Sequence, residues 1–167
     1  MTEPHPDPEG YFTFDLAEGD LRYSRGGGRL LAFPMSAMNS VLGLRFDEIQ
    51  KNLPYTIGLH LGEECGRRVI EAMGGTMRAE MTPESFLDHL NAVLALHGLG
   101  VVKLETWGDI LLFRWRMSED AKQKLLEFQE GVLAGVLREV TGQPFEATSV
   151  DEDFEGARFL AGNAAMV

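Results

Sequence analysis

The side chains that could do chemistry are few in this sequence, and they are widely spaced. His60 and Glu64 are four residues apart, so that a helix would place them on one face, where they could begin a metal site. No third ligand accompanies them, and we favour a solvated pair. The acidic run at residues 151–153 could hold a hard cation, although such a run more often marks a solvated turn between strands. Because Cys65 is the only cysteine, a closed shell of nitrogen and sulfur ligands cannot form, and we expect neither a tightly bound transition metal nor any other cofactor.

No catalytic arrangement accompanies these residues. The sequence has no serine or cysteine nucleophile with a recognisable partner histidine, and no strand followed by the glycine fingerprint of a dinucleotide site. The stretch RGGGR at residues 25–29 lacks the lysine and hydroxyl residue of a P-loop, and a flexible hairpin turn explains it better. We therefore expect a protein that binds rather than converts its ligand, and an enzyme stays open as an alternative.

The most informative pattern is a row of glycines inside a helix. The stretch IGLHLGEECG at residues 57–66 has a glycine at every fourth position, although each interior glycine costs a helix about 1 kcal/mol relative to alanine. A second helix, FQEGVLAGVLREVTG, repeats the pattern. Glycine on the apolar face lets another backbone or a ligand come unusually close. The two helices therefore predict a tight crossing or a cavity between them, lined by Gly58, Gly62, Gly66, Gly131 and Gly135.

The order of the expected elements predicts an α+β fold, with helices on one face of an antiparallel sheet. Thr82, Pro83 and Gly98 are start and stop signals of a helix. We expect helices at residues 36–52, 55–73, 83–97 and 118–142, and strands at 11–14, 21–24, 99–117 (a hairpin), 145–150 and 157–161. Residues 1–10, with three prolines, predict a disordered lead-in, and residues 11–167 predict a single domain.

The composition excludes several classes of partner. The net charge of −11 repels nucleic acid and anionic lipid, whose binding depends on lysine and arginine. No apolar run approaches the roughly 20 residues that a membrane-spanning helix needs, so no membrane insertion is expected. A single cysteine fits a reducing compartment, and we expect a cytoplasmic protein.

Three stretches together resemble a known family. A helix reading IGLHLGEECGRRVIEAM, the later HGLGVVKLE and the late FQEGVLAGVLREVTG are similar to the 4-vinyl reductase domain, which shares its fold with the Bet-type subunits of the TRAPP tethering complexes. The resemblance implies helices packed on a twisted antiparallel sheet, a homodimer built on the early helices, and a hydrophobic pocket. It also implies small hydrophobic ligands of an aromatic, tetrapyrrole-related or acyl type.

Departures from that family limit what the resemblance carries. Its phenol-sensing members have a cysteine-bearing zinc motif near the C-terminus, whereas this chain has SVDEDFEGARFLAG there. The tryptophan that those members place between two glycines is Leu99 here, and the acylated cysteine of the TRAPP subunits has no equivalent. Neither zinc nor covalent acylation is therefore expected.

Aromatic residues near the hairpin and the second glycine helix complete the expected ligand pocket. We predict that it is formed by the five glycines together with His97, Trp107, Phe113, Trp115 and Phe128. His97 could instead serve the dipole at the end of its helix. The function we expect is a non-enzymatic homodimeric domain that binds a small hydrophobic ligand and acts through a protein partner. The alternatives are a TRAPP-like scaffold subunit without a ligand, or an accessory factor in tetrapyrrole metabolism.

Overall fold

The structure is a computed structural model that describes residues 12–15, 20–23, 29–30, 53–74, 82–116, 126–153 and 156–163. Its first three strands form a small antiparallel sheet of order β1-β2-β3, made of β1 (Phe12–Asp15), β2 (Asp20–Tyr23) and β3 (Arg29–Leu30). The two early strands expected from the sequence are thus confirmed. The lead-in at residues 1–10, the helix expected at 36–52 and the first residues of the one expected at 118–142 lie outside the described residues.

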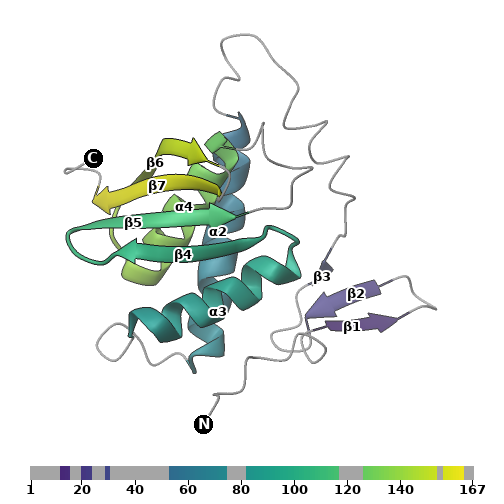
Figure 1. Cartoon of the computed structure of the whole chain (residues 1–167). Helices are drawn as coiled ribbons and strands as arrows, with labels where there is room; N and C mark the ends of the chain where they lie inside the picture. The colour runs from purple at the N-terminus through teal and green to yellow at the C-terminus, as the bar shows by residue number, and fades with distance from the viewer. Residues whose placement is uncertain are drawn as a thin grey trace.

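The main body combines three helices with a four-stranded sheet (Figure 1). The helices are α2 (Leu53–Ala72), α3 (Pro83–Leu96) and α4 (Leu126–Thr141). The strands are β4 (Val101–Thr106), β5 (Ile110–Arg116), β6 (Phe145–Asp153) and β7 (Gly156–Asn163). The sheet has the order β4-β5-β7-β6, and every neighbouring pair is antiparallel.

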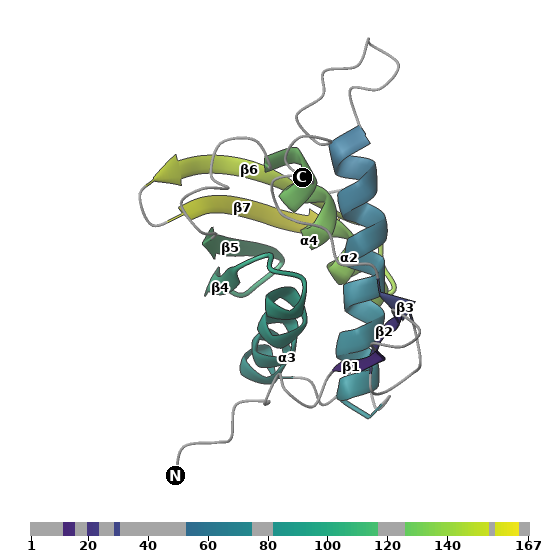
Figure 2. The same cartoon turned by 90° about the vertical axis from the view of Figure 1, so that its right-hand side faces the viewer.

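The helices lie in layers on one face of the twisted sheet. Helix α4 packs on β6 and β7, α3 packs along β4, and α2 packs against both helices. Figure 2 shows the sheet on one side and α2 on the other, with α4 beside it. The expected α+β architecture is confirmed.

Local signals set the ends of α3 as the sequence predicts. The Thr82 hydroxyl accepts a hydrogen bond from the Ser85 amide at 3.2 Å, which supplies one of the partners that a helix start lacks. At the other end Gly98 has a φ of +66°, and the Leu99 amide donates to the Leu94 carbonyl at 3.0 Å. This closure turns the chain directly into β4.

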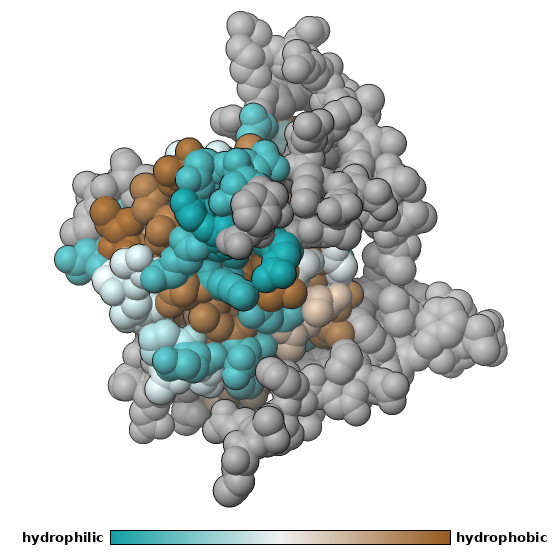
Figure 3. All heavy atoms as spheres, in the orientation of Figure 1, coloured by the Kyte–Doolittle hydropathy of each residue, from teal (hydrophilic) through white to brown (hydrophobic). Residues whose placement is uncertain are grey.

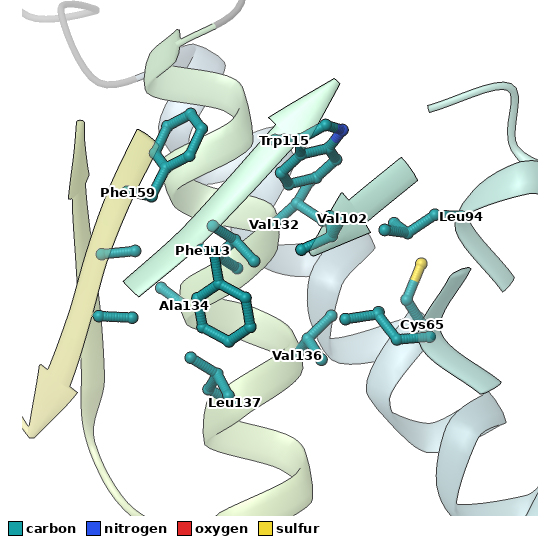
Figure 4. Packing of buried hydrophobic residues seen from close by; sticks show 14 of the residues in the cluster. Cys65, Leu94, Val102, Phe113, Trp115, Val132, Ala134, Val136, Leu137 and Phe159 are labelled. Atoms are coloured by element: carbon teal, nitrogen blue, oxygen red, sulfur yellow. The ribbon is translucent and has the colours of Figure 1, made fainter. Parts of the chain in front are cut away.

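Alternation along β5 separates the core from the outer face of the sheet. Phe113 and Trp115 are buried beneath the helices, and Trp115 meets Phe159 of β7 edge to face, with ring centroids 6.2 Å apart. Figure 4 shows Phe113 pointing from β5 toward Val136 and the other labelled residues of α4. The sheet and α4 therefore share one apolar core.

The outer face carries a network of charges across all four strands. Arg114 on β5 lies opposite Arg158 on β7, and their like charges are neutralised by carboxylates. Arg114 pairs with Glu105 at 2.5 Å and Asp153 at 3.1 Å, and Arg158 with Asp151 at 3.0 Å. The acidic run is thus part of β6, where we expected a turn. Arg158 on β7 and Arg114 on β5 provide partners for the carboxylates of Asp151 and Asp153. Figure 3 shows hydrophilic and hydrophobic residues side by side on this view of the molecule.

Candidate functional site

The glycines of α2 lie directly against the backbone of α4. A Cβ placed on Gly58 would lie 2.1 Å from the carbonyl oxygen of Phe128, and one on Gly62 would lie 2.2 Å from that of Val132. At Gly66 it would meet the Glu139 side chain at 2.8 Å. Because real Cβ contacts are never as short as the first two, no residue but glycine fits these positions without a shift of the helices.

The glycines of α4 complete the same crossing from the other side. A Cβ on Gly131 would lie 2.1 Å from the carbonyl oxygen of Tyr55, and one on Gly135 would lie 2.2 Å from that of Leu59. Gly58 contacts Phe128 and Gly62, one turn later, contacts Val132, one turn later on α4. Because the contacts follow the same chain direction on both helices, α2 and α4 run parallel. Of the two possibilities left open by the sequence, these contacts are those of a tight crossing.

The expected aromatic residues divide into two groups. Phe113, Trp115 and Phe128 are each less than 2% exposed and belong to the core between the sheet and the helices. Trp107 lies in the β4–β5 hairpin, and 55% of it is exposed. The structure therefore brings three of these rings into one apolar region and leaves the fourth at the surface.

His97 lies in the corner between α3 and α2, where Glu64 and Arg68 of α2 act on it electrostatically. Burial lowers the pKa of its imidazole, the nearby Glu64 opposes that change, and Arg68 adds to it. A lowered pKa disfavours the charged imidazole, which weakens the charge–dipole role considered from the sequence. A neutral imidazole has one donor and one acceptor nitrogen.

The chain turns toward the core immediately after His97. The indole nitrogen of Trp115 donates a hydrogen bond to the Leu99 carbonyl at 2.6 Å, and Leu99 itself is buried. This bond joins the segment after α3 to the last part of β5. The segment that follows His97 is consequently tied to the apolar core.

The other chemically suggestive residues have structural partners. His60 pairs with Glu63 at 3.3 Å, and Glu64 pairs with Arg67 and Arg68 at 3.0 Å each, so His60 and Glu64 do not act together. Within the described residues, no group of three or more potential ligands is arranged to hold a metal ion. Cys65 is fully buried, and its burial, with a smaller effect of Glu64, raises the thiol pKa to about 12. This residue packs as a small buried hydrophobe.

One polar cluster has no signal in the sequence. The Tyr55 hydroxyl on α2 donates to Glu146 on β6 at 2.6 Å, and Arg138 on α4 bonds the other carboxylate oxygen of Glu146. Burial, followed by the hydrogen bond to Glu146, raises the pKa of Tyr55 to about 12. Tyr55 and Glu146 are 91 residues apart, so no local pattern could have paired them.

The fold is similar to that of proteins of known structure. The phenol-responsive sensory domain of the transcription activator PoxR, solved with phenol, superimposes with a TM-score of 0.71 over 94% of this chain and 87% of that domain, at 14% identity. The chain has the fold of that sensory domain. This agrees with the resemblance proposed from the sequence at the level of the fold.

Two further structures are similar over shorter parts of the chain. Trafficking protein particle complex subunit 3 from Naegleria fowleri, covalently bound to palmitic acid, has a TM-score of 0.51 over 77% of this chain and 89% of that one, at 13% identity. A vinyl-4-reductase family protein from Methanocaldococcus jannaschii has a TM-score of 0.49 over 81% and 84%, at 14% identity. No protein-family model and no curated protein matches the sequence. None of the described helices is long and apolar enough to cross a membrane.

Proposed function

We propose that this chain is a non-enzymatic domain that binds a small hydrophobic ligand and acts through a protein partner. The observation that carries the proposal is the likeness to the PoxR sensory domain, which extends over 94% of this chain. That domain is phenol-responsive and was solved with phenol. A compact aromatic molecule with one polar group is accordingly the first ligand class to test.

The proposed binding region is the apolar core next to the α2–α3 corner. Phe113, Trp115 and Phe128 would supply apolar contacts, and His97 would bind the polar group. Trp107 lies in the hairpin at the opposite end of β4 from His97, so it would lie outside this compact region. The five glycines support the region by holding α2 and α4 in backbone contact. Because Cys65, the only cysteine, is buried with a raised pKa, the ligand would be held without a covalent bond.

We further propose a homodimer built on the early helices. The early region of the sequence also has several apolar residues that favour such an interface, and they lie outside the described residues: Met35, Met38, Val41, Leu42 and Leu44. Sedimentation at micromolar concentration tests it, and a monomer there would contradict it. Tetrapyrrole-related molecules and acyl chains are the other ligand classes that the resemblance implies.

A scaffold without a ligand is the second candidate. It is supported by the likeness to the trafficking-complex subunit, and by exposed apolar side chains on the described surface, Val101, Ile110 and Val150, which could contact another protein. Under this alternative the core would be filled by side chains alone.

Native mass spectrometry and calorimetric titration with phenol separate the two candidates. The ligand hypothesis predicts a retained small molecule, or saturable binding of phenol, which His97→Ala weakens about tenfold through the loss of one hydrogen bond in a desolvated site. The matched control is His60→Ala, since that side chain is 72% exposed and pairs only with Glu63 among the described residues. A protein that binds neither phenol nor any co-purified molecule would favour the scaffold.

A further inference from the structure

Within the part of the chain that the structure describes, the four-stranded sheet has two edge strands, β4 and β6, each with one strand neighbour. The backbone groups that an edge strand points away from its neighbour can pair with a strand of another chain. In this protein, side chains from the helices form hydrogen bonds with several of those backbone groups at both edges.

At β4 the occupant is Asn91, from the middle of α3. Its side-chain amide donates to the Val102 carbonyl at 2.9 Å, and its carbonyl oxygen accepts from the Val102 amide at 2.8 Å. An asparagine amide has the same donor and acceptor pair as a peptide unit. Asn91 therefore takes the place that a residue of an added strand would take.

At β6 the occupants are Glu130 and Arg138, eight residues apart on α4. Glu130 accepts a hydrogen bond from the Ser149 amide at 2.7 Å, and Arg138 donates one to the Phe145 carbonyl at 2.7 Å. Ala147, between these two positions, is 4% exposed. Farther along, β6 has a register shift and then an exposed acidic run, two features that disfavour edge pairing.

We propose that these helix side chains close both edges of the sheet to strand addition. Asn91 blocks β4 at Val102, and Glu130 with Arg138 blocks the first half of β6. A second copy of the chain or an extended peptide would find these backbone groups already bonded, which favours protein contacts through the helices or the outer face. The inference depends on the hydrogen bonds at the edges and is independent of the ligand hypothesis.

The test compares the parent with Glu130→Ala, Asn91→Ala and the double variant, by sedimentation over a range of concentrations. Opening the edges should raise the average mass above that of the parent at high concentration, most strongly in the double variant. Glu130→Gln keeps an acceptor for the Ser149 amide and should sediment like the parent. Matched controls are Glu127→Ala and Asp88→Ala, exposed positions on the same two helices.

Hydrogen exchange separates edge pairing from unfolding. In Asn91→Ala the Val102 amide should exchange roughly tenfold faster in dilute protein and regain protection as association proceeds. The amide of Phe159, which is fully buried, should stay as protected as in the parent. Variants that keep the parent's mass at every concentration would overturn the proposal. Association that appears only when Phe159 loses its protection would also overturn it.

Discussion

Gly62 and Val132 are in backbone contact, since a Cβ on Gly62 would lie 2.2 Å from the carbonyl oxygen of Val132. Alanine is the better helix former by about 1 kcal/mol, but here its methyl group would force the two helices apart. We expect Gly62→Ala to lower the free energy of unfolding by roughly 2 kcal/mol, and the melting temperature by about 4 to 8 °C. Thermal and denaturant unfolding measure both quantities.

Gly135→Ala should behave in the same way, because Gly135 contacts the Leu59 carbonyl across the same crossing. Once one added methyl group has moved the helices apart, the second has more room and causes less steric overlap. The double variant should therefore lose less unfolding free energy than the sum of the two single losses. Thr56→Ala, at an exposed position of α2, is the control and should change stability by less than about 0.5 kcal/mol. Full parental stability in Gly62→Ala would show that the glycine row is not a contact surface.

Gly98 should be sensitive for a different reason. Nothing lies within 4 Å of the Cβ that a side chain would add, but its φ of +66° is in the left-handed region. Gly98→Ala should cost about 1 kcal/mol through backbone strain, and Gly98→Asn should cost less, because asparagine tolerates this conformation better. Equal losses in the two variants, measured by denaturant unfolding, would contradict this explanation.

Tyr55 should make stability depend on pH in the alkaline range. Its pKa is raised from 10.0 to about 12, so the folded protein holds the phenolic proton more tightly than the unfolded chain does. The corresponding contribution is complete below pH 10 and is lost as the pH rises from about 10 to about 12. The difference in unfolding free energy between the parent and Tyr55→Phe should shrink across that range, with a size reduced by solvent screening. A pH-independent difference would speak against the pKa shift.

Cys65 should be unreactive in the folded protein. Its thiol is fully buried, and its pKa of about 12 leaves almost no thiolate at pH 8. We expect no labelling by a disulfide reagent in native buffer, and one labelled thiol per chain after unfolding in guanidinium. Rapid labelling of the native protein would show that α2 and α3 open at this position.

The local elements could be predicted from neighbouring residues. Thr82, Pro83 and Gly98 delimit α3 because each supplies a backbone geometry or a hydrogen bond within one helical turn. The alternation of Phe113 and Trp115 with Arg114 predicts the two faces of β5, which the structure confirms. Neither inference requires a residue distant in the sequence.

The sequence by itself determined that two helices have glycine rows, but only the tertiary structure decided what lies against them. A glycine row allows close approach, whereas the identity of the neighbour depends on packing between α2 and α4, which are separated by more than fifty residues. The same limit applies to the bond between Tyr55 and Glu146 and to the burial that lowers the pKa of His97. Hydrogen bonds within one helical turn and the alternation of side chains depend on adjacent residues, so the sequence predicts them. Desolvation and pairing between distant residues arise only once the elements have packed together.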